Sequence, residues 1–333
     1  MQFKILVNNI EQLDLALEHL SKGDVNNARF ALMLIDNVIE ITLHHVALEK
    51  QAEQKWLSRE KVYEHSNALN AALGQRFERK ISFARIIEIV TAEESETINI
   101  LHGFRNEVYH IGLQHETILL EISKFYLKLA GDILARYFPS SLSYSSTYCP
   151  PERALKYFNI KNREFFSPRN NEYSAACLKL SQEVKFDPVI FTETLSNHMD
   201  EIIDQSDTSI DMMANGGPQK YSRDEAIIEG MAWKIAFSEE GKLFAEEHAW
   251  PGGNTFDLIK WIGMFYPFEL KSDPIQGWKK RADATRREKN PHKALKKYND
   301  FMSQTSESRA FLEEQCAAID RYIDGQIDLM RGK

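Results

Sequence analysis

Apolar residues recur every three or four positions through most of the first 138 residues, a spacing that predicts amphipathic helices. A short helix is expected over 10–20. A long second helix is expected over 24–54, with Asp24 as its N-cap. One side of this long helix carries a regular apolar stripe, which we expect to face the core: Ala28, Leu32, Ile35, Ile39, Leu43 and Val46.

The same periodicity continues beyond the long helix. Thr91 followed by Glu94 resembles a capping box, which marks a helix start. The turns between neighbouring apolar stretches are short, so the helices should pack as antiparallel neighbours in a bundle. Residues 81–90 are helical or strand-like by composition, and we favour a helix there. The other helices expected in this part of the chain cover residues 56–79, 91–111 and 115–137.

A stretch rich in serine and proline, 139–151, interrupts the helical pattern. Such composition is typical of an exposed linker, so we predict a domain boundary there. The first domain is then 1–138 and the second is 152–333. In the second domain the pattern predicts helices over 186–207, 223–250, 255–265 and 306–331. The predicted fold class is mainly α.

Composition narrows the class of protein. The chain has 333 residues, of which 43% are hydrophobic and 27% charged, as in ordinary globular proteins of about two domains. Its three cysteines form no CxxC pair, which argues against a thiolate metal site or a disulfide framework. The sequence shows neither a signal-peptide core nor an apolar run of about 18 residues, so we expect a cytoplasmic protein without a membrane segment.

The formal net charge of −8 conceals two stretches of opposite sign. Acidic residues dominate 200–249, whereas basic residues dominate 278–298. The basic stretch also carries interleaved aromatic residues, a combination that suits a nucleic-acid backbone. The alternative is a solvated basic face that pairs with the acidic stretch. The candidate RNA-binding residues are Lys279, Lys280, Arg281, Arg286, Arg287, Lys293, Lys296 and Lys297.

The segment 102–110 gathers unusual polar residues on one side of a predicted helix. With Arg105 taken as zero and ~100° per residue around the helix axis, the other four polar residues lie between about 40° and 140°. Apolar residues occupy the opposite arc between about 240° and 320°. Surface helices usually carry Glu, Lys and Gln instead, which are better helix formers. The polar group consists of His102, Arg105, Asn106, Tyr109 and His110.

These side chains match the chemistry of a phosphodiester. Arg105 offers a permanently charged fork of donors for two phosphate oxygens. His110 can take and return a proton near neutral pH, because free imidazole has a pKa of ~6.5. Asn106 lies one turn before His110 and can bind a ring nitrogen, the sugar or the phosphate. No carboxylate cage for a hard cation lies nearby, so we expect neither a metal nor another cofactor.

Structural interpretations compete with this one. An Arg-x4-His pair also arises by chance, and either side chain can simply cap or coat a helix. Asp36 in the long helix needs a polar partner if it is half-buried, as its position indicates. That partner is either Arg105 or a histidine of the neighbouring helix, or the carboxylate is bonded elsewhere at the rim. Glu40 and His44 are expected to be a structural i,i+4 pair.

Residues 105–110, Arg-Asn-Glu-Val-Tyr-His, late in an all-helical bundle, resemble the Arg-x(4–6)-His signature of the HEPN superfamily (higher eukaryotes and prokaryotes nucleotide-binding). Asn106 matches the polar residue that often follows the arginine. The second helix, Ala28–Glu40, is also similar to that of the family. The resemblance covers roughly residues 1–138. Some members carry a modified tyrosine two residues after the histidine, where this chain has Gly112.

The resemblance implies a metal-independent endoribonuclease in which a ribose 2′-oxygen attacks the adjacent phosphorus. Carried onto this chain, His110 is the general base or acid, Arg105 binds the scissile phosphate and Asn106 positions the reacting groups. His102, Tyr109 and Asp36 are supporting residues. The resemblance also implies a homodimer through the first domain and a toxin or antiphage effector that cleaves tRNA or another cellular RNA. An antitoxin or other regulatory partner would then control it.

Two functions of other classes remain open at this point. The first is a non-catalytic module that binds RNA or a nucleotide and dimerises. The second is an adaptor whose basic stretch grips an acidic surface of another protein, which predicts salt-sensitive protein binding and indifference to RNA.

Overall fold

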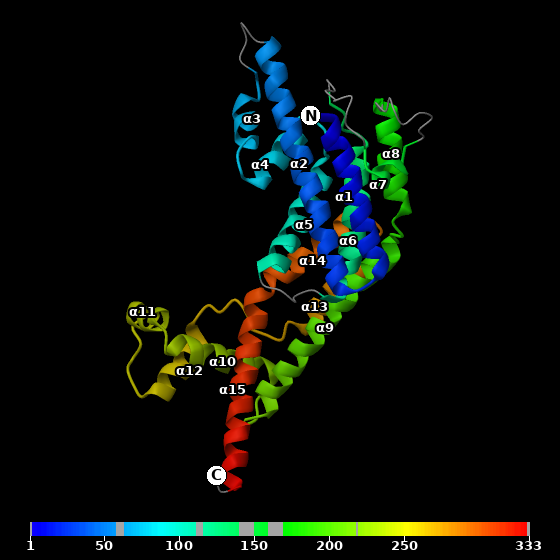
Figure 1. The fold of residues 1–333 in the computed structure, drawn as a ribbon. Coiled ribbons are helices and arrows are strands. Elements are labelled where there is room, and N and C mark those ends of the chain that lie inside the picture. Colours follow the sequence, from blue (N-terminus) through cyan, green and yellow to red (C-terminus); the bar gives the residue numbers. More distant parts are fainter. Residues whose placement is uncertain are drawn as a thin grey trace. The chain divides into compact units, whose positions relative to one another are not determined.

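The computed structural model describes residues 2–57, 63–110, 116–139, 150–158, 169–217 and 219–331. These residues form 15 helices and no strand, which confirms the predicted mainly α fold class (Figure 1). The described chain divides into two compact units. Unit 1 comprises 1–195 with 288–296, and unit 2 comprises 196–287 with 297–333.

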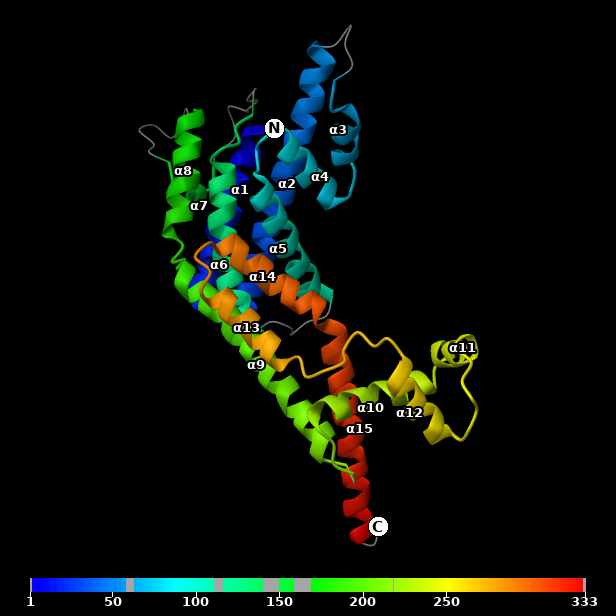
Figure 2. The same ribbon diagram turned by 180° about the vertical axis from the view of Figure 1, so that it is seen from behind.

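Unit 1 is built on a bundle of long helices. Helix α2 (Val25–Leu57) packs against α1 (Gln2–Lys22) and α6 (Glu116–Leu134), and α5 (Ala92–His110) packs against α2 (Figure 2). The apolar stripe predicted for the second helix is buried, as expected from its 3.6-residue spacing. The core of unit 1 therefore lies between these helices.

Short-range sequence signals set the starts of two of these helices. Thr91 Oγ1 accepts from the Glu94 backbone N–H at 3.1 Å, and a Glu94 carboxylate oxygen accepts from the Thr91 N–H at 2.8 Å. This is the predicted capping box, and α5 begins directly after it. Asp24 accepts from the Asn27 N–H at 3.0 Å, which confirms the predicted N-cap of α2. That hydrogen bond also lowers the pKa of the Asp24 carboxyl.

The region predicted as one helix over 56–79 and another over 81–90 is divided differently. Helices α3 (Ser66–Ala72) and α4 (Phe77–Ile86) are separated by a turn that contains Gly74. Residues 58–62 lie outside the described part. The two helices share a small core with α2, which includes Ala47 and Phe83. The break between α3 and α4 therefore allows both helices to pack on α2.

The predicted domain boundary at 139–151 is not the boundary between the compact units, because unit 1 continues to residue 195. Residues 140–149 lie outside the described part. Helix α7 (Glu152–Leu155) is held to α1 through Arg153, whose Nη1 donates to Asp14 Oδ2 at 2.8 Å. Tyr157 also donates a hydrogen bond to the buried Asp14 carboxylate.

Helix α8 (Asn170–Glu183), which the sequence analysis did not identify, extends unit 1 further. Ser181 on α8 donates to Asp132 at 2.8 Å. The helix approaches α6 so closely that a Cβ on Gly131 would lie 2.6 Å from the Ser181 Cβ. Residues 288–296 join the same unit, since Asn290 donates to Glu93 at 2.8 Å and Thr97 bonds His292 at 2.8 Å. Such contacts between distant segments leave no signal in local composition.

Unit 2 is also helical. Helices α9 (Pro188–Asn215) and α14 (Pro291–Gln304) each begin in unit 1 and continue into unit 2. The helical region predicted over 223–250 holds two helices, α10 (Arg223–Ala236) and α11 (Glu239–Glu247). Ser238 caps the start of the second by accepting from the Gly241 N–H at 3.0 Å. The remaining helices are α12 (Thr255–Phe265), α13 (Ile275–Arg286) and α15 (Ser306–Met330).

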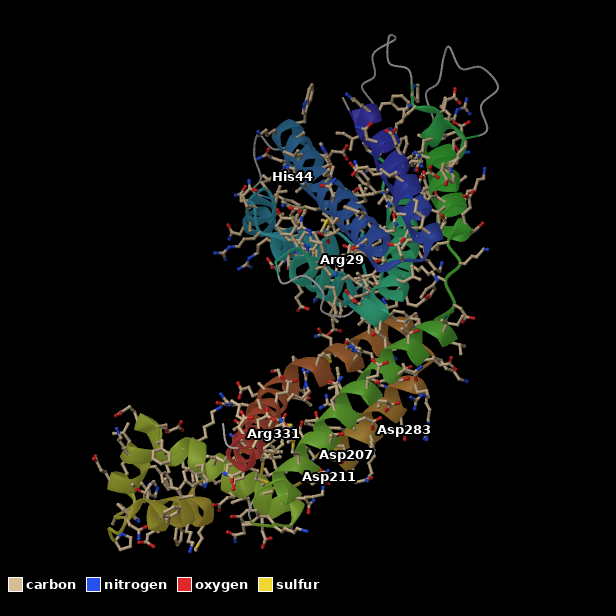
Figure 3. The ribbon with its side chains drawn as sticks, turned by 60° about the horizontal axis from the view of Figure 1, so that its bottom comes forward. Arg29, His44, Asp207, Asp211, Asp283 and Arg331 are labelled. Atoms are coloured by element: carbon tan, nitrogen blue, oxygen red, sulfur yellow. The ribbon has the colours of Figure 1, made fainter. Side chains whose placement is uncertain are left out.

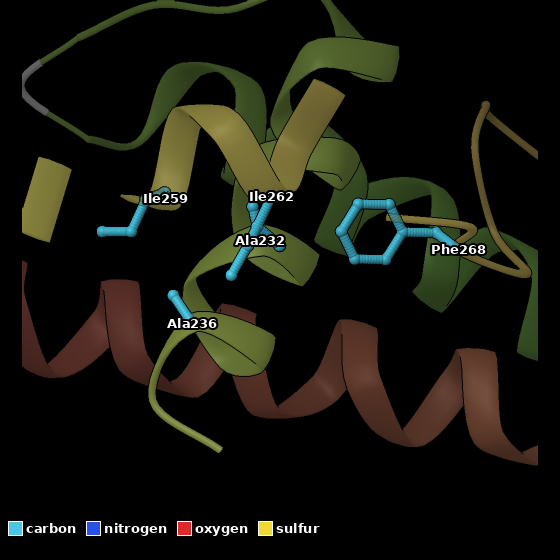
Figure 4. Packing of buried hydrophobic residues seen from close by; sticks show 5 residues of the cluster. All are labelled: Ala232, Ala236, Ile259, Ile262 and Phe268. Carbon is cyan, nitrogen blue, oxygen red and sulfur yellow. The ribbon is translucent and has the colours of Figure 1, made fainter. Parts of the chain in front are cut away.

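A compact apolar cluster joins α10 and α12 in unit 2. Ala232 and Ala236 of α10 pack with Ile259 and Ile262 of α12, and Phe268 closes the cluster (Figure 4). The small alanine side chains allow the two helix axes to approach. Helices α13 and α14, which carry most of the basic stretch, were not predicted.

Helix α2 is more apolar than the sequence analysis, which found no apolar run of about 18 residues, had recognised. By length and composition Val25–Trp56 is apolar enough to cross a membrane, with a mean hydropathy of 1.4 over its most apolar window. Of that window, 56% is buried inside the protein. Because α2 packs against α1 and α6, its apolar character is accounted for by its place in the core of unit 1.

Glu49 on α2 should make the stability of unit 1 depend on pH. Burial raises the pKa of its carboxyl to about 7, although a hydrogen bond from Tyr137 opposes the shift. Between the unfolded-state pKa of ~4.3 and about 7, the folded chain holds a proton that the unfolded chain has released. The free energy of unfolding attributable to Glu49 therefore falls as the pH rises through this range.

We expect Glu49→Gln to remove this dependence. In thermal melts between pH 5 and pH 8, the wild-type Tm should fall more steeply than that of the variant, and the variant should be the more stable protein at pH 8. Glu53→Gln is the matched control, since Glu53 lies on the exposed side of the same helix and pairs with Lys50. Parallel pH curves for all three proteins would contradict the assignment.

Candidate active site

Helix α5 separates apolar and polar side chains as the sequence predicts. Ile98, Leu101, Phe104 and Val108 are buried. The opposite side carries the predicted polar group, of which His102, Arg105 and Asn106 are half-buried and Tyr109 is exposed. The last residue of the helix is His110, and its side chain lies outside the described part.

Asp36 on α2 is the centre of the site. Its side chain is 1% exposed, so it is buried rather than half-buried as expected. Tyr126 of α6 donates to Asp36 Oδ1 at 2.9 Å, and His102 Nδ1 lies 3.0 and 3.1 Å from the two carboxylate oxygens. Arg105 Nε lies 3.5 Å from Oδ2. The carboxylate thus contacts both candidate partners on α5, and these contacts offset the cost of burying its charge.

The partners of Asp36 are themselves fixed in position. Burial, with the Asp36 charge as the next cause, holds the pKa of Tyr126 well above its ordinary value. The Tyr126 hydroxyl therefore stays protonated and remains a donor. The His102 ring stacks on Phe77 of α4, with 3.8 Å between the ring centroids and 18° between the planes. Because a carboxylate only accepts, the hydrogen on His102 belongs at Nδ1.

Arg105 is anchored at its inner edge and accessible at its outer edge. Its Nη1 donates to Asn106 Oδ1 at 3.0 Å, and its Cζ lies 5.6 Å from the centre of the Tyr109 ring. Its Nε is buried without a hydrogen bond, because the approach of Asp36 is an ionic contact only. The side chain is still 33% exposed. A guanidinium held in this way keeps donors available to an oxyanion that reaches α5 from solvent.

The structure brings together five of the predicted residues of the first domain: Asp36, His102, Arg105, Asn106 and Tyr109. His110, to which the sequence analysis assigned proton transfer, is the last residue of α5, and its side chain lies outside the described part. Among the residues that the structure describes, no group of three or more His, Cys, Asp or Glu side chains is arranged to hold a metal ion.

Sequence analysis missed two residues near this site. Tyr126 stands in an apolar helix, where an aromatic ring reads as core, and only its hydroxyl reveals the polar contact. The sequence analysis gave Lys80 of α4 no role, but it is buried and donates to Glu40 at 2.7 Å. The one available signal was the position of Lys80, which falls on the same three-to-four-residue spacing as the apolar residues of α4.

The basic stretch 278–298 does not form one surface within one unit. Lys293 and Lys296 belong to unit 1, whereas the other six candidate residues belong to unit 2. Several of the cations are already engaged. Lys279 lies 3.4 Å from Asp207 of α9, which is labelled in Figure 3. Arg286 pairs with Asp200, and Lys296 pairs with Glu96.

The alternative interpretation of this stretch is therefore supported for part of it, since Asp200 and Asp207 belong to the acidic stretch 200–249. Arg281 lies over the Phe301 ring at 5.2 Å, and Lys297 donates to the Ala284 carbonyl at 3.2 Å. Within the described ranges, no ion-pair partner is found for the remaining candidates, Lys280, Arg287 and Lys293.

Comparison of the chain with protein-family models, with curated proteins and with solved structures gave no match.

Proposed function

We propose that this protein is a metal-independent endoribonuclease of the HEPN type. The observation that carries the proposal is the Arg105 guanidinium, which is held by buried Asp36 and by Asn106 while a third of the side chain stays exposed. An arginine fixed in one orientation can bind a phosphate without first losing rotamer freedom. A toxin or defence effector that acts on tRNA or another cytoplasmic RNA is the biological role that accompanies this activity.

In the proposed reaction the ribose 2′-oxygen attacks the adjacent phosphorus. A new P–O2′ bond forms and the P–O5′ bond breaks, which leaves a 2′,3′-cyclic phosphate and a 5′-hydroxyl. The proton leaves the 2′-hydroxyl for a base and the departing 5′-oxygen receives one from an acid, and His110 serves in these roles. Arg105 stabilises the negative charge that builds on the phosphoryl oxygens. Pairing of unit 1 with a second copy supplies a second motif to the same cleft.

One observation favours a second candidate, the non-catalytic module that binds RNA or a nucleotide. The Asp36 carboxylate balances the Arg105 charge, as it would in a purely structural ion pair between α2 and α5. In that case the polar side of α5 binds a nucleotide, and no bond is broken.

Incubation of the purified protein with tRNA in excess EDTA separates the two candidates. The nuclease predicts fragments that accumulate at the same rate with and without EDTA. It also predicts 3′ ends that accept a ligated adaptor only after the cyclic phosphate is opened and removed. Intact RNA in both conditions, together with a measurable Kd for that RNA, would favour the binding module.

A further inference from the structure

A pocket of about 240 Å³ opens beside the candidate active site, between α2, the turn before α4, and α4 itself. His44, labelled in Figure 3, lies on its α2 side. Like most ligand pockets, it has a mainly apolar surface on which a small number of polar groups converge. The lining residues are Asn37, Glu40, Ile41, His44, His45, Gly74, Gln75 and Lys80.

A charge-balanced pair forms one wall of the pocket. The Lys80 ammonium donates to Glu40 Oε1 at 2.7 Å, and the side chains are 5% and 36% exposed respectively. Within the described part of the chain, no hydrogen bond is found to the second oxygen of Glu40. The Lys80 ammonium has three N–H donors, of which this bond uses one. The wall therefore presents an acceptor and a donor next to each other.

The rest of the pocket lining contains no lysine or arginine. Burial lowers the pKa of His45, and the neighbouring His44 adds to the shift, which favours a neutral imidazole. His44 Nδ1 is buried without a hydrogen-bond partner. A phosphate would find no uncompensated cation here. A flat, uncharged heterocycle whose edge carries both donors and acceptors suits this lining better.

We propose that this pocket binds a guanine base of the RNA substrate. The Watson–Crick edge of guanine places N1–H and N2–H beside the O6 acceptor. Glu40 accepts from N1–H and N2–H, and Lys80 donates to O6. Adenine presents the reverse arrangement, since its N1 would face the carboxylate and its 6-amino group would face the ammonium. This inference rests on the proposed function, whose substrate preference it specifies.

The pocket is adjacent to the residues that would hold the phosphate. Glu40 follows Asp36 by one turn of α2, which corresponds to ~6 Å along the helix axis. Asp36 in turn contacts Arg105, whose Nε lies 3.5 Å from Oδ2, so the pocket wall and the guanidinium lie on either side of this one carboxylate along α2 and α5. A nucleotide with its base against Glu40 can therefore place a phosphate near Arg105.

Calorimetric titration of the wild-type protein with nucleoside monophosphates tests this proposal without any cleavage. GMP should bind at least ~10-fold more tightly than AMP, because a bidentate contact discriminates by about that factor. IMP retains O6 and N1–H but lacks the 2-amino group, so its affinity should lie between the two. Equal Kd values for GMP and AMP, or no binding of GMP at millimolar concentration, would overturn the proposal.

A variant tests whether Glu40 is the residue that causes the preference for GMP over AMP. Glu40→Gln replaces one acceptor oxygen by a donor, so the Kd values for AMP and GMP should differ by no more than ~2-fold in this variant. Glu121→Gln is the matched control, because Glu121 also pairs with a lysine in unit 1, Lys124 at 2.6 Å, but does not line the pocket. The control should keep the wild-type ratio. An unchanged ratio in a folded Glu40→Gln protein would overturn the assignment.

The outcomes distinguish this inference from the proposed function. A preference for GMP in a protein that never cuts RNA leaves the pocket assignment standing and the nuclease wrong. Cleavage in EDTA without any preference for GMP leaves the nuclease standing and the pocket assignment wrong. If the protein cuts RNA, sequencing of the fragment ends should show a guanine at one fixed position next to the cut, and random bases there would count against the pocket.

Discussion

Replacing His110 with Ala is expected to lower the rate of RNA cleavage by about 10²–10⁴-fold, the usual contribution of a general acid or base. The affinity for RNA should change little, because Arg105, the group proposed to bind the scissile phosphate, is retained. Single-turnover cleavage and filter binding on the same RNA measure the two quantities. His248→Ala is the control, since His248 is an exposed histidine at the end of α11 and should have no effect.

Arg105→Lys completes this experiment. Lysine keeps the positive charge but loses the planar fork that Asp36 and Asn106 hold in place. We expect cleavage to fall by about 10²-fold or more, with RNA affinity reduced less. A His110→Ala protein that cuts RNA at the wild-type rate would contradict the proposed chemistry, whatever the behaviour of the Arg105 variant.

Asp36→Asn is expected to lower both the stability of the protein and its turnover. The amide is almost the same shape, but it carries no charge to face Arg105. It also has a single acceptor oxygen, where the carboxylate offers two to His102 and Tyr126. Disturbing a buried, hydrogen-bonded carboxylate of this kind should lower the free energy of unfolding by about 1–3 kcal/mol. Because Arg105 then loses its anchor, kcat should fall by more than ~10-fold while KM changes less.

A second buried carboxylate supplies the matched control. Asp14 on α1 is also a buried carboxylate held by a tyrosine and an arginine, Tyr157 and Arg153, at a different place in unit 1, and it pairs with Lys156 where Asp36 contacts a histidine. Asp14→Asn should therefore cost a similar free energy of unfolding and leave kcat unchanged in the folded protein. If both variants lower kcat equally, Asp36 acts only through stability and is not a positioning residue.

Local signals in the sequence were sufficient for the long helices α2 and α5 and for the residues at which they start. The apolar stripe of α2, the Asp24 N-cap and the Thr91–Glu94 capping box depend on residues within a few positions of each other, and each is present as predicted. The two-sided character of α5 follows from the same periodicity. Asp36 was singled out because an acid on an apolar helix face needs a partner.

The remainder depends on contacts between distant segments. Arg153 and Ser181 attach α7 and α8 to unit 1 through Asp14 and Asp132, so the unit continues beyond the predicted linker. Lys279 and Arg286 were predicted to contact RNA, but each is paired with an acid of α9. Charge counted along the sequence does not show which charges neutralise each other in space.

The 2′-oxygen as the attacking group is the central claim, and one substrate tests it most directly. An RNA with a single 2′-deoxynucleotide on the 5′ side of the mapped cut site is incubated with the wild-type protein in EDTA. The account predicts that cleavage at that bond is lost, while an RNA with the deoxynucleotide placed several residues away is cut at the normal rate. Cleavage of both RNAs at equal rates would contradict it.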